Sequence, residues 1–241
     1  MHAIGFWHQQ SRADRDDHVT IDLSNILPSE QYNFQKMPLS TAQLLNVPYN
    51  YGSVMQYYPY AFAIDSSKYT ILAKDSKYQN SMGQREAPAF SDLIAVNTLY
   101  NCTKLCKTQL SCSNCGFTDS RNCNKCKCPH YFSGTNCNDL PSGTAPNCNG
   151  AVLQLQLTAA PLSAICIQEC PWQSLEINLG KFDLYGIITC CDTFVNQTLT
   201  SEANLIALRG IIRYNQLTYS IRYRAVPSTS RAATSSLCFM K

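Results

Sequence analysis

The first 101 residues contain no cysteine, whereas the 140 that follow contain all 14. Cysteine at that density is typical of secreted, disulfide-stabilised chains and is rare in cytosolic ones. The sequence also lacks any run of Lys and Arg, and its formal net charge is only +3. A nucleic-acid-binding protein is expected to carry a basic stripe, so that class is excluded.

A long apolar segment is missing as well. The nearest candidate, 150–167, is interrupted by Gln154, Gln156 and Pro161, which excludes it as a membrane span. No signal peptide is visible, because only Met1 stands before the first motif. The cysteines therefore predict a secretory route for which the N-terminus supplies no signal. The two observations agree if the native protein begins further upstream, or if this product is never exported.

Half of a zinc-binding pattern is present at the N-terminus. His2, Gly5 and His8 form H-x-x-G-x-x-H, the second half of H-E-x-x-H-x-x-G-x-x-H, without its first His and its Glu. On a regular helix of about 3.6 residues per turn, residues six apart lie about 240° round from one another. Gly5 can end the helix in the left-handed conformation and turn the chain back, so that His8 meets His2. The alternative is two ordinary histidines at a helix end.

Three longer segments identify the surrounding family. The segments are GFWHQQSRADRDDHVTI (5–21), YGSVMQYYPYAFA (51–63) and TILAKDSKYQNSMGQREAPAFSDLIAVNTLYNC (70–102). In this order they resemble the zinc-binding stretch, the Met-turn and the C-terminal end of the catalytic domain in the astacin family of zinc metalloendopeptidases. The resemblance implies that His2 and His8 ligate zinc and that Met55 lies beneath the metal without ligating it. It implies that Tyr57 ligates zinc at rest and swings away to stabilise the transition state, a role that suits a phenol beside a metal.

The chain departs from the family pattern at several positions. Gln9 replaces the Glu that ties down the mature N-terminus in the family, Gln56 replaces the common Met-turn His, and His18 replaces a Tyr. The first His ligand, the Glu that acts as general base and the N-terminal subdomain would lie upstream of Met1, as would the family's partner for Cys102. A catalytic zinc site normally has three protein ligands, and general-base assistance is commonly worth 10²–10⁴-fold in rate. We therefore expect weak zinc binding and little or no proteolysis from these residues alone, with His18 and His130 as surface or loop residues.

The cysteine-rich centre resembles an EGF-like module over CKTQLSCSNCGFTDSRNCNKCKCPHYFSGTNC (106–137). C-x-x-C pairs there also fit a zinc knuckle on spacing alone. Cys102 and Cys115 do not belong to the six cysteines of the EGF-like pattern, and they could pair with each other or mispair. The EGF resemblance implies three disulfides: Cys106–Cys123, Cys112–Cys126 and Cys128–Cys137.

The tail from 148 returns to alternation of apolar and polar residues, which predicts β-strands. Its position after the first two parts, its CPW and its CCDTF resemble a CUB domain, a β-sandwich; such tails generally bind proteins or matrix. Two sequons, at Asn101 and Asn196, predict N-glycosylation.

Local patterns predict a few elements within the first hundred residues. We expect an extended stretch over 18–26, a helical turn over 38–47 and a terminal helix within 87–100. Leu93, Val96 and Tyr100 are at helical spacing on that helix, and Ser91 or Asp92 could cap it. An apolar patch is expected around Phe6, Trp7, Met55 and the neighbouring tyrosines.

Together these features predict an α+β multidomain chain. The expected parts are the C-terminal half of an astacin-like catalytic domain, irregular with about two helices (1–102), a disulfide-rich EGF-like module (103–138), a linker (139–147) and a CUB-like β-sandwich (148–241). The expected activity is zinc-dependent hydrolysis of protein or peptide substrates, with zinc as cofactor and a secreted, extracellular location. The alternative is a secreted pseudoprotease or matrix-binding protein that acts through the EGF-like and CUB-like modules, with no nucleic acid and no membrane span.

Overall fold

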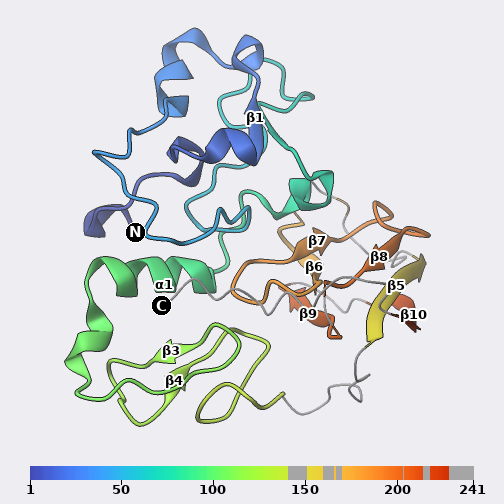
Figure 1. The fold of residues 1–241 in the computed structure, drawn as a ribbon. Helices are drawn as coiled ribbons and strands as arrows, with labels where there is room; N and C mark the ends of the chain where they lie inside the picture. Colours follow the sequence, from blue (N-terminus) through green and yellow to red (C-terminus); the bar gives the residue numbers. More distant parts are fainter. Residues whose placement is uncertain (141–150, 160–165, 167–169, 203, 214–217, 228–241) are drawn as a thin grey trace.

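The computed structural model describes residues 1–140, 151–159, 166, 170–202, 204–213 and 218–227. Three parts follow one another along the chain: an N-terminal region to residue 101, a cysteine-rich region to residue 140, and a β domain. Figure 1 shows the N-terminal region on one side of helix α1 (Phe90–Leu99), the hairpin β3–β4 on the other side, and the strands of the β domain beside them. The expected linker lies mostly outside the described residues, as does the start of the β domain at residue 148.

The N-terminal region contains little regular structure. Its only sheet pairs β1 (Val19–Ile21) antiparallel with β2 (Ile71–Ala73), so the extended stretch expected over 18–26 is three residues long. Short 3-10 helices supply most of the remaining turns: η1 His2–Ile4, η2 Gln9–Ser11, η3 Arg15–Asp17, η4 Leu23–Asn25, η5 Pro28–Phe34 and η6 Ser76–Ser81. A further one, η7 Cys102–Leu105, begins the cysteine-rich region.

Buried aromatic and aliphatic side chains hold this irregular chain together. Clusters of large apolar side chains can stabilise turns and loops, because each buried side chain of this size contributes about 1.5–3 kcal/mol. Tyr57 and Phe62 pack against the cluster from its edge. The cluster consists of Val19, Ile26, Phe34, Tyr49, Ala61, Ile71 and Met82.

The terminal helix expected within 87–100 forms as α1. Phe90 and Ile94 are buried and pack with Val47 and with Phe117 of the cysteine-rich region, whereas Tyr100 is 55% exposed. Leu93, Val96 and Tyr100, whose spacing predicted the helix, are therefore not its most buried residues. The helix is apolar on nearly every side, so its partners in space decide which face is covered.

Only one α-helix occurs in the described part of the chain, instead of the two expected in the N-terminal region. The segment 38–47 forms a turn in which the Ala42 amide donates to the Pro38 carbonyl at 3.0 Å. Leu45 and Asn46 then adopt positive φ angles of 54° and 53°, and Pro48 follows. A chain cannot continue an α-helix through left-handed residues, so the turn ends there.

The cysteine-rich region folds around its disulfides. β3 (Phe117–Thr118) and β4 (Cys126–Lys127) form a small hairpin, and the bridges are Cys106–Cys123, Cys112–Cys126 and Cys128–Cys137, the three pairs that the EGF resemblance implies. Cys115 is also disulfide-bonded, whereas Cys102 is free, so these two do not pair with each other. No zinc knuckle forms within the described residues of this region, because the cysteines of its C-x-x-C pairs are in disulfides.

The described residues of the β domain form two antiparallel sheets of three strands, in the order β10-β5-β8 and β7-β6-β9. Leu155 and Leu157 of one sheet pack with Leu175, Ile177 and Ile187 of the other, which is the layered packing of a sandwich. The strands are β5 Ala151–Ala159, β6 Gln173–Asn178, β7 Ile187–Thr189, β8 Thr198–Thr200, β9 Ala207–Ile212 and β10 Ser220–Pro227.

Two disulfides, Cys166–Cys191 and Cys170–Cys190, tie β7 and the residues after it to the segment before β6. Within the described residues, no helix has the length and apolar character needed to cross a bilayer.

Candidate metal site

Gly5 brings the two histidines of the half-motif together. The 3-10 helix η1 ends at Gly5, whose φ of 84° and ψ of 14° place it in the left-handed region. No atom lies within 4 Å of the position that a Cβ would occupy, so backbone conformation alone requires glycine there. As a result the Nε2 atoms of His2 and His8 lie 3.1 Å apart.

Hydrogen bonds at the other ring nitrogens fix the tautomers of both histidines. Nδ1 of His2 lies 2.8 Å from the Phe6 carbonyl oxygen, and Nδ1 of His8 lies 2.9 Å from the Met55 carbonyl oxygen. A carbonyl only accepts, so each Nδ1 carries the proton and each Nε2 presents a lone pair. Carbonyls placed behind the ring in this way are what orient histidine ligands of metals.

The donor atoms fit a zinc ion. Two lone pairs facing one another at 3.1 Å repel unless a cation, either a proton or a metal ion, lies between them. Tetrahedral zinc with Zn–N bonds of about 2.0–2.1 Å holds two imidazole nitrogens about 3.3 Å apart, close to the observed spacing. Burial lowers the pKa of His8 below its usual value, and the nearby His2 and Arg85 lower it further, against the Met55 carbonyl, which raises it. His8 is therefore held in the neutral form that a metal requires.

In the part of the chain that the structure describes, His2 and His8 have no third ligand of the usual kind beside them. Within the described residues, no group of three or more His, Cys, Asp and Glu side chains gathers closely enough to hold a metal. His18 stacks on Tyr49 with ring centroids 4.6 Å apart, and His130 lies beside Glu86 and Arg209 in the contact with the β domain. Neither histidine belongs to the site.

Met55 contacts His8 through its backbone carbonyl, and its side chain is buried. Its carbonyl oxygen accepts from the Gln9 amide at 3.0 Å as well as from His8, and its own amide donates to Ser53 Oγ at 3.1 Å. Because Met55 is only 7% exposed, it is not part of an apolar surface patch, contrary to expectation. Trp7 is 52% exposed and does belong to the surface.

Asp92 holds the Met-turn to helix α1, a role that the sequence did not reveal. Its carboxylate accepts from Ser53 Oγ at 2.6 Å, from the Val54 amide at 3.2 Å and from the Ala89 amide at 2.9 Å. Asp92 therefore supports the first turn of α1 from its third position and the Met-turn at the same time. Burial raises its pKa, although the three donors lower it.

Tyr57 lies against His8, with ring centroids 4.3 Å apart. Two buried glutamines hold its backbone: Gln10 Oε1 accepts from the Tyr57 amide at 3.4 Å, and Gln56 Nε2 donates to the Tyr57 carbonyl at 3.2 Å. Burial raises the pKa of the Tyr57 phenol, so it remains protonated in the absence of a metal. The structure thus brings His2, His8, Met55 and Tyr57 together.

Two positions at which the chain departs from the family pattern contact the same residue. The Tyr49 hydroxyl donates to Gln56 Oε1 at 2.6 Å, and the Tyr49 ring stacks on His18 at an interplanar angle of 12°. Gln56 in turn bonds the Tyr57 carbonyl, so His18, Tyr49 and Gln56 form a continuous support behind Tyr57. Spacing along the chain gave no signal for Tyr49.

A cavity of about 270 Å³ opens beside His8. Its walls come from the half-motif, from the turn over 40–48 and from α1, and they include Trp7, Gln9 and Leu99. The two sequon asparagines, Asn101 and Asn196, are exposed and both have positive φ, and their glycosylation stays a prediction.

Comparisons with known proteins agree with the site's family features. Residues 1–101 match the family model for astacin, which describes a family of peptidases. The chain is 64% identical over 275 residues to zinc metalloproteinase nas-28 of Caenorhabditis elegans, covering 97% of this chain and 55% of that protein. It is 30% identical to zinc metalloproteinase nas-29 of the same organism, covering 95% of this chain and 49% of that protein.

A solved structure also matches. It is high choriolytic enzyme 1, a hatching enzyme zinc-protease from the medaka Oryzias latipes, at 38% identity and a TM-score of 0.37, covering 40% of this chain and 46% of that chain. The chain spans about half the length of the curated relatives it matches.

Proposed function

We propose, from the astacin-family sequence of residues 1–101, that this chain contributes part of the active site of a zinc metalloendopeptidase. The observation that carries the proposal is the facing pair of Nε2 atoms on His2 and His8, 3.1 Å apart, each set by a carbonyl at Nδ1. His2 and His8 would hold zinc, which when bound supplies a Lewis acid that polarises a peptide carbonyl and makes water more acidic.

The roles of the remaining residues follow from their positions. Tyr57 lies against His8 with a protonated phenol, so it can donate a hydrogen bond to an oxyanion that develops beside the metal ligands. Gln10 and Gln56 hold the Tyr57 backbone while its side chain remains half-buried. Asp92 and Met55 keep the floor of the site in place.

We also propose that the 241 residues alone do not hydrolyse peptides. The sequence carries no His-Glu pair beside His2, and the described residues hold no carboxylate in a group with the two histidines. A base that deprotonates water is commonly worth 10²–10⁴-fold in rate, and two histidines with a phenol form a weak zinc site. The cysteine-rich region is proposed as EGF-like and the β domain as CUB-like, with protein or matrix partners; the disulfides support a secreted, extracellular protein.

Zinc titration by calorimetry tests the proposal. We expect one weakly bound zinc per chain and loss of that binding in His8→Ala, while His130→Ala, a histidine of the β-domain contact, leaves it unchanged. Equal zinc binding by wild type and His8→Ala would refute the metal site. Zinc-dependent turnover of a peptide library by the 241-residue chain would refute the proposed inactivity.

A further inference from the structure

The β domain makes direct contact with the chain that leads into the Met-turn. Tyr185, which lies just before β7 and is 9% exposed, packs on Gly52 so closely that a Cβ at Gly52 would overlap the Tyr185 side chain. The Tyr185 amide lies 3.3 Å from Asn50 Oδ1, which also accepts from the Gly52 amide at 2.9 Å. Ser81 Oγ donates to the Gly186 carbonyl at 2.8 Å. Tyr185–Gly186 is therefore built into the N-terminal region.

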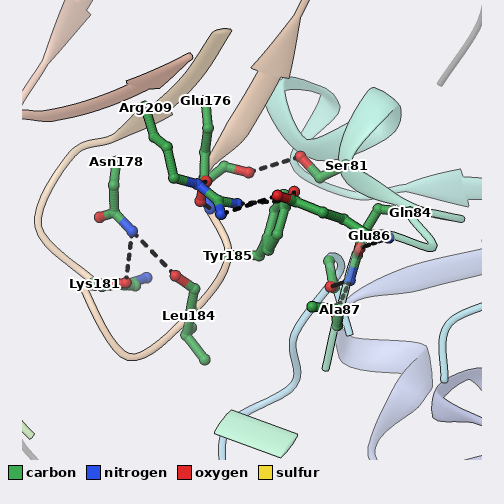
Figure 2. A network of polar contacts seen from close by, with 12 residues as sticks. Ser81, Gln84, Glu86, Ala87, Glu176, Asn178, Lys181, Leu184, Tyr185 and Arg209 are labelled. Carbon is green, nitrogen blue, oxygen red and sulfur yellow. Dashed lines mark hydrogen bonds and ion pairs between the residues drawn. The ribbon is translucent and has the colours of Figure 1, made fainter. Parts of the chain in front are cut away.

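A charged network joins the same two parts (Figure 2). Arg209 of β9 donates to both oxygens of Glu86, at 3.1 and 3.3 Å, and its Nε donates to Glu176 at 2.6 Å. The Tyr185 hydroxyl donates to Glu86 at 3.0 Å, and the Arg209 guanidinium lies over the Tyr185 ring. Glu176 is 2% exposed and also accepts from the Gly186 amide. One guanidinium therefore bridges a buried carboxylate, Glu176, and a carboxylate at the surface, Glu86.

The loop that carries Glu86 also makes hydrogen bonds to the Met-turn. Gln84 Nε2 donates to the Gly52 carbonyl at 2.6 Å, and Gln84 Oε1 accepts from the Glu86 amide at 2.8 Å. Arg85 Nη1 donates to the Gln56 carbonyl at 3.1 Å, on the peptide bond that enters Tyr57. The Met-turn is thus held at both ends of Gly52–Gln56 by a loop whose own position is fixed from the β domain.

We propose that Tyr185 and Arg209 are positioning residues for the metal site: through Glu86 and Gly52 they fix the Met-turn on which His8 and Tyr57 rest. The description of Gly52–Tyr57 as a metal-site support rests on the proposed function; the mechanical coupling does not. The β domain is then a part of the site's framework, because the Met55 carbonyl that orients His8 belongs to the segment that Tyr185 and Arg85 restrain.

Hydrogen–deuterium exchange of the whole chain tests this coupling. The variants are Tyr185→Phe, which removes only the hydroxyl bound to Glu86, and Glu86→Gln, which weakens both its contacts. The matched control is Tyr219→Phe, since the Tyr219 hydroxyl donates to the Thr189 carbonyl at 2.8 Å inside the β domain. The amides of Gly52, Gln56 and Tyr57 all donate to internal acceptors and report on the Met-turn.

We expect exchange at 52–57 to rise about fivefold or more in both variants, as the loss of one charge-assisted hydrogen bond would produce. Exchange at β1 and β2 should stay unchanged, Tyr219→Phe should leave 52–57 unchanged, and zinc affinity should fall several-fold in Glu86→Gln. A rise confined to 84–87, or an equal rise across the whole chain, would overturn the proposal, because the contact would then be local or only stabilising. Failure of the wild-type chain to bind zinc would overturn the proposed function and leave the exchange result valid.

Discussion

Replacement of the buried Asp92 is expected to separate the free energy of its hydrogen bonds from that of its charge. The carboxylate accepts from three buried donors, Ser53 Oγ and the amides of Val54 and Ala89. In Asp92→Ala all three lose their partner, and an unsatisfied buried donor costs about 1–3 kcal/mol. With partial relaxation we expect a loss of about 3–5 kcal/mol in the free energy of unfolding. Asp92→Asn keeps one acceptor oxygen and should lose about 1–2 kcal/mol less.

The penalty of Asp92→Asn should also depend on pH. Burial raises the folded-state pKa of Asp92 above 3.8, its ordinary value, so the folded state prefers the protonated carboxyl. The stability contributed by that group is fully present below the unfolded-state pKa and is lost as pH rises through the folded-state pKa. Asparagine does not titrate. The stability difference between wild type and Asp92→Asn should therefore be largest in acid and shrink towards neutral pH.

Urea unfolding followed by circular dichroism between pH 3.5 and pH 7 measures both effects. The control is Asp75→Asn. The Asp75 side chain is 43% exposed, accepts from the Lys77 amide and pairs with the Lys77 ammonium, so this substitution should lower the free energy of unfolding by less than about 1 kcal/mol. A wild-type advantage over Asp92→Asn that grows with pH would refute the reasoning, because it would show that the three donors outweigh burial.

Three further predictions concern other parts of the chain. Gly5→Ala should weaken zinc binding about 5- to 30-fold by calorimetry, since a left-handed alanine costs about 1–2 kcal/mol. Gly210→Ala should not, since a Cβ at Gly210 would meet only the Ile212 Cδ1 atom, at 4.0 Å. Replacing Cys112 and Cys126 by serine removes their disulfide and should lower the stability of the cysteine-rich region by about 3 kcal/mol. In limited proteolysis that region should then be cleaved earlier in time than the β domain, and equal resistance of the two would contradict the prediction. Leu157→Ala, 1% exposed between the sheets, should cost about 2–5 kcal/mol in thermal unfolding, against under about 1 for Leu208→Ala, 43% exposed; similar losses would argue against the sandwich core.

Features set by neighbours in the sequence could be predicted. The left-handed turn at Gly5 follows from a six-residue spacing that a regular helix cannot reconcile with a shared ligand, and it occurs. The existence of α1 was also predictable, but its buried face was not. Phe90, Leu93, Ile94 and Val96 are spread around the helix, and only the positions of Val47 and Phe117 decide which are covered.

Contacts between distant segments left no local signal. Glu86 and Arg209 are 123 residues apart, and nothing in either segment identifies the other as its partner. Nothing in the sequence distinguishes Tyr49 from the other tyrosines among the 14; its role follows from the hydrogen bond that its hydroxyl donates to Gln56. The adjacent Cys190 and Cys191 offer two equivalent choices to any pairing argument, and their bridges to Cys170 and Cys166 are settled only by the geometry of the β domain.

The close packing of Tyr185 on Gly52 also constrains how the two parts can change in evolution. A side chain at position 52 requires a smaller residue at position 185, so substitutions at the two positions should be correlated among related chains that share the β domain. A relative that carries the Met-turn without this domain has no tyrosine to accommodate, and its position 52 is free to vary. Domain exchange between relatives should therefore fail where a side chain at position 52 from one chain meets a tyrosine at position 185 from the other, even if each domain folds well alone.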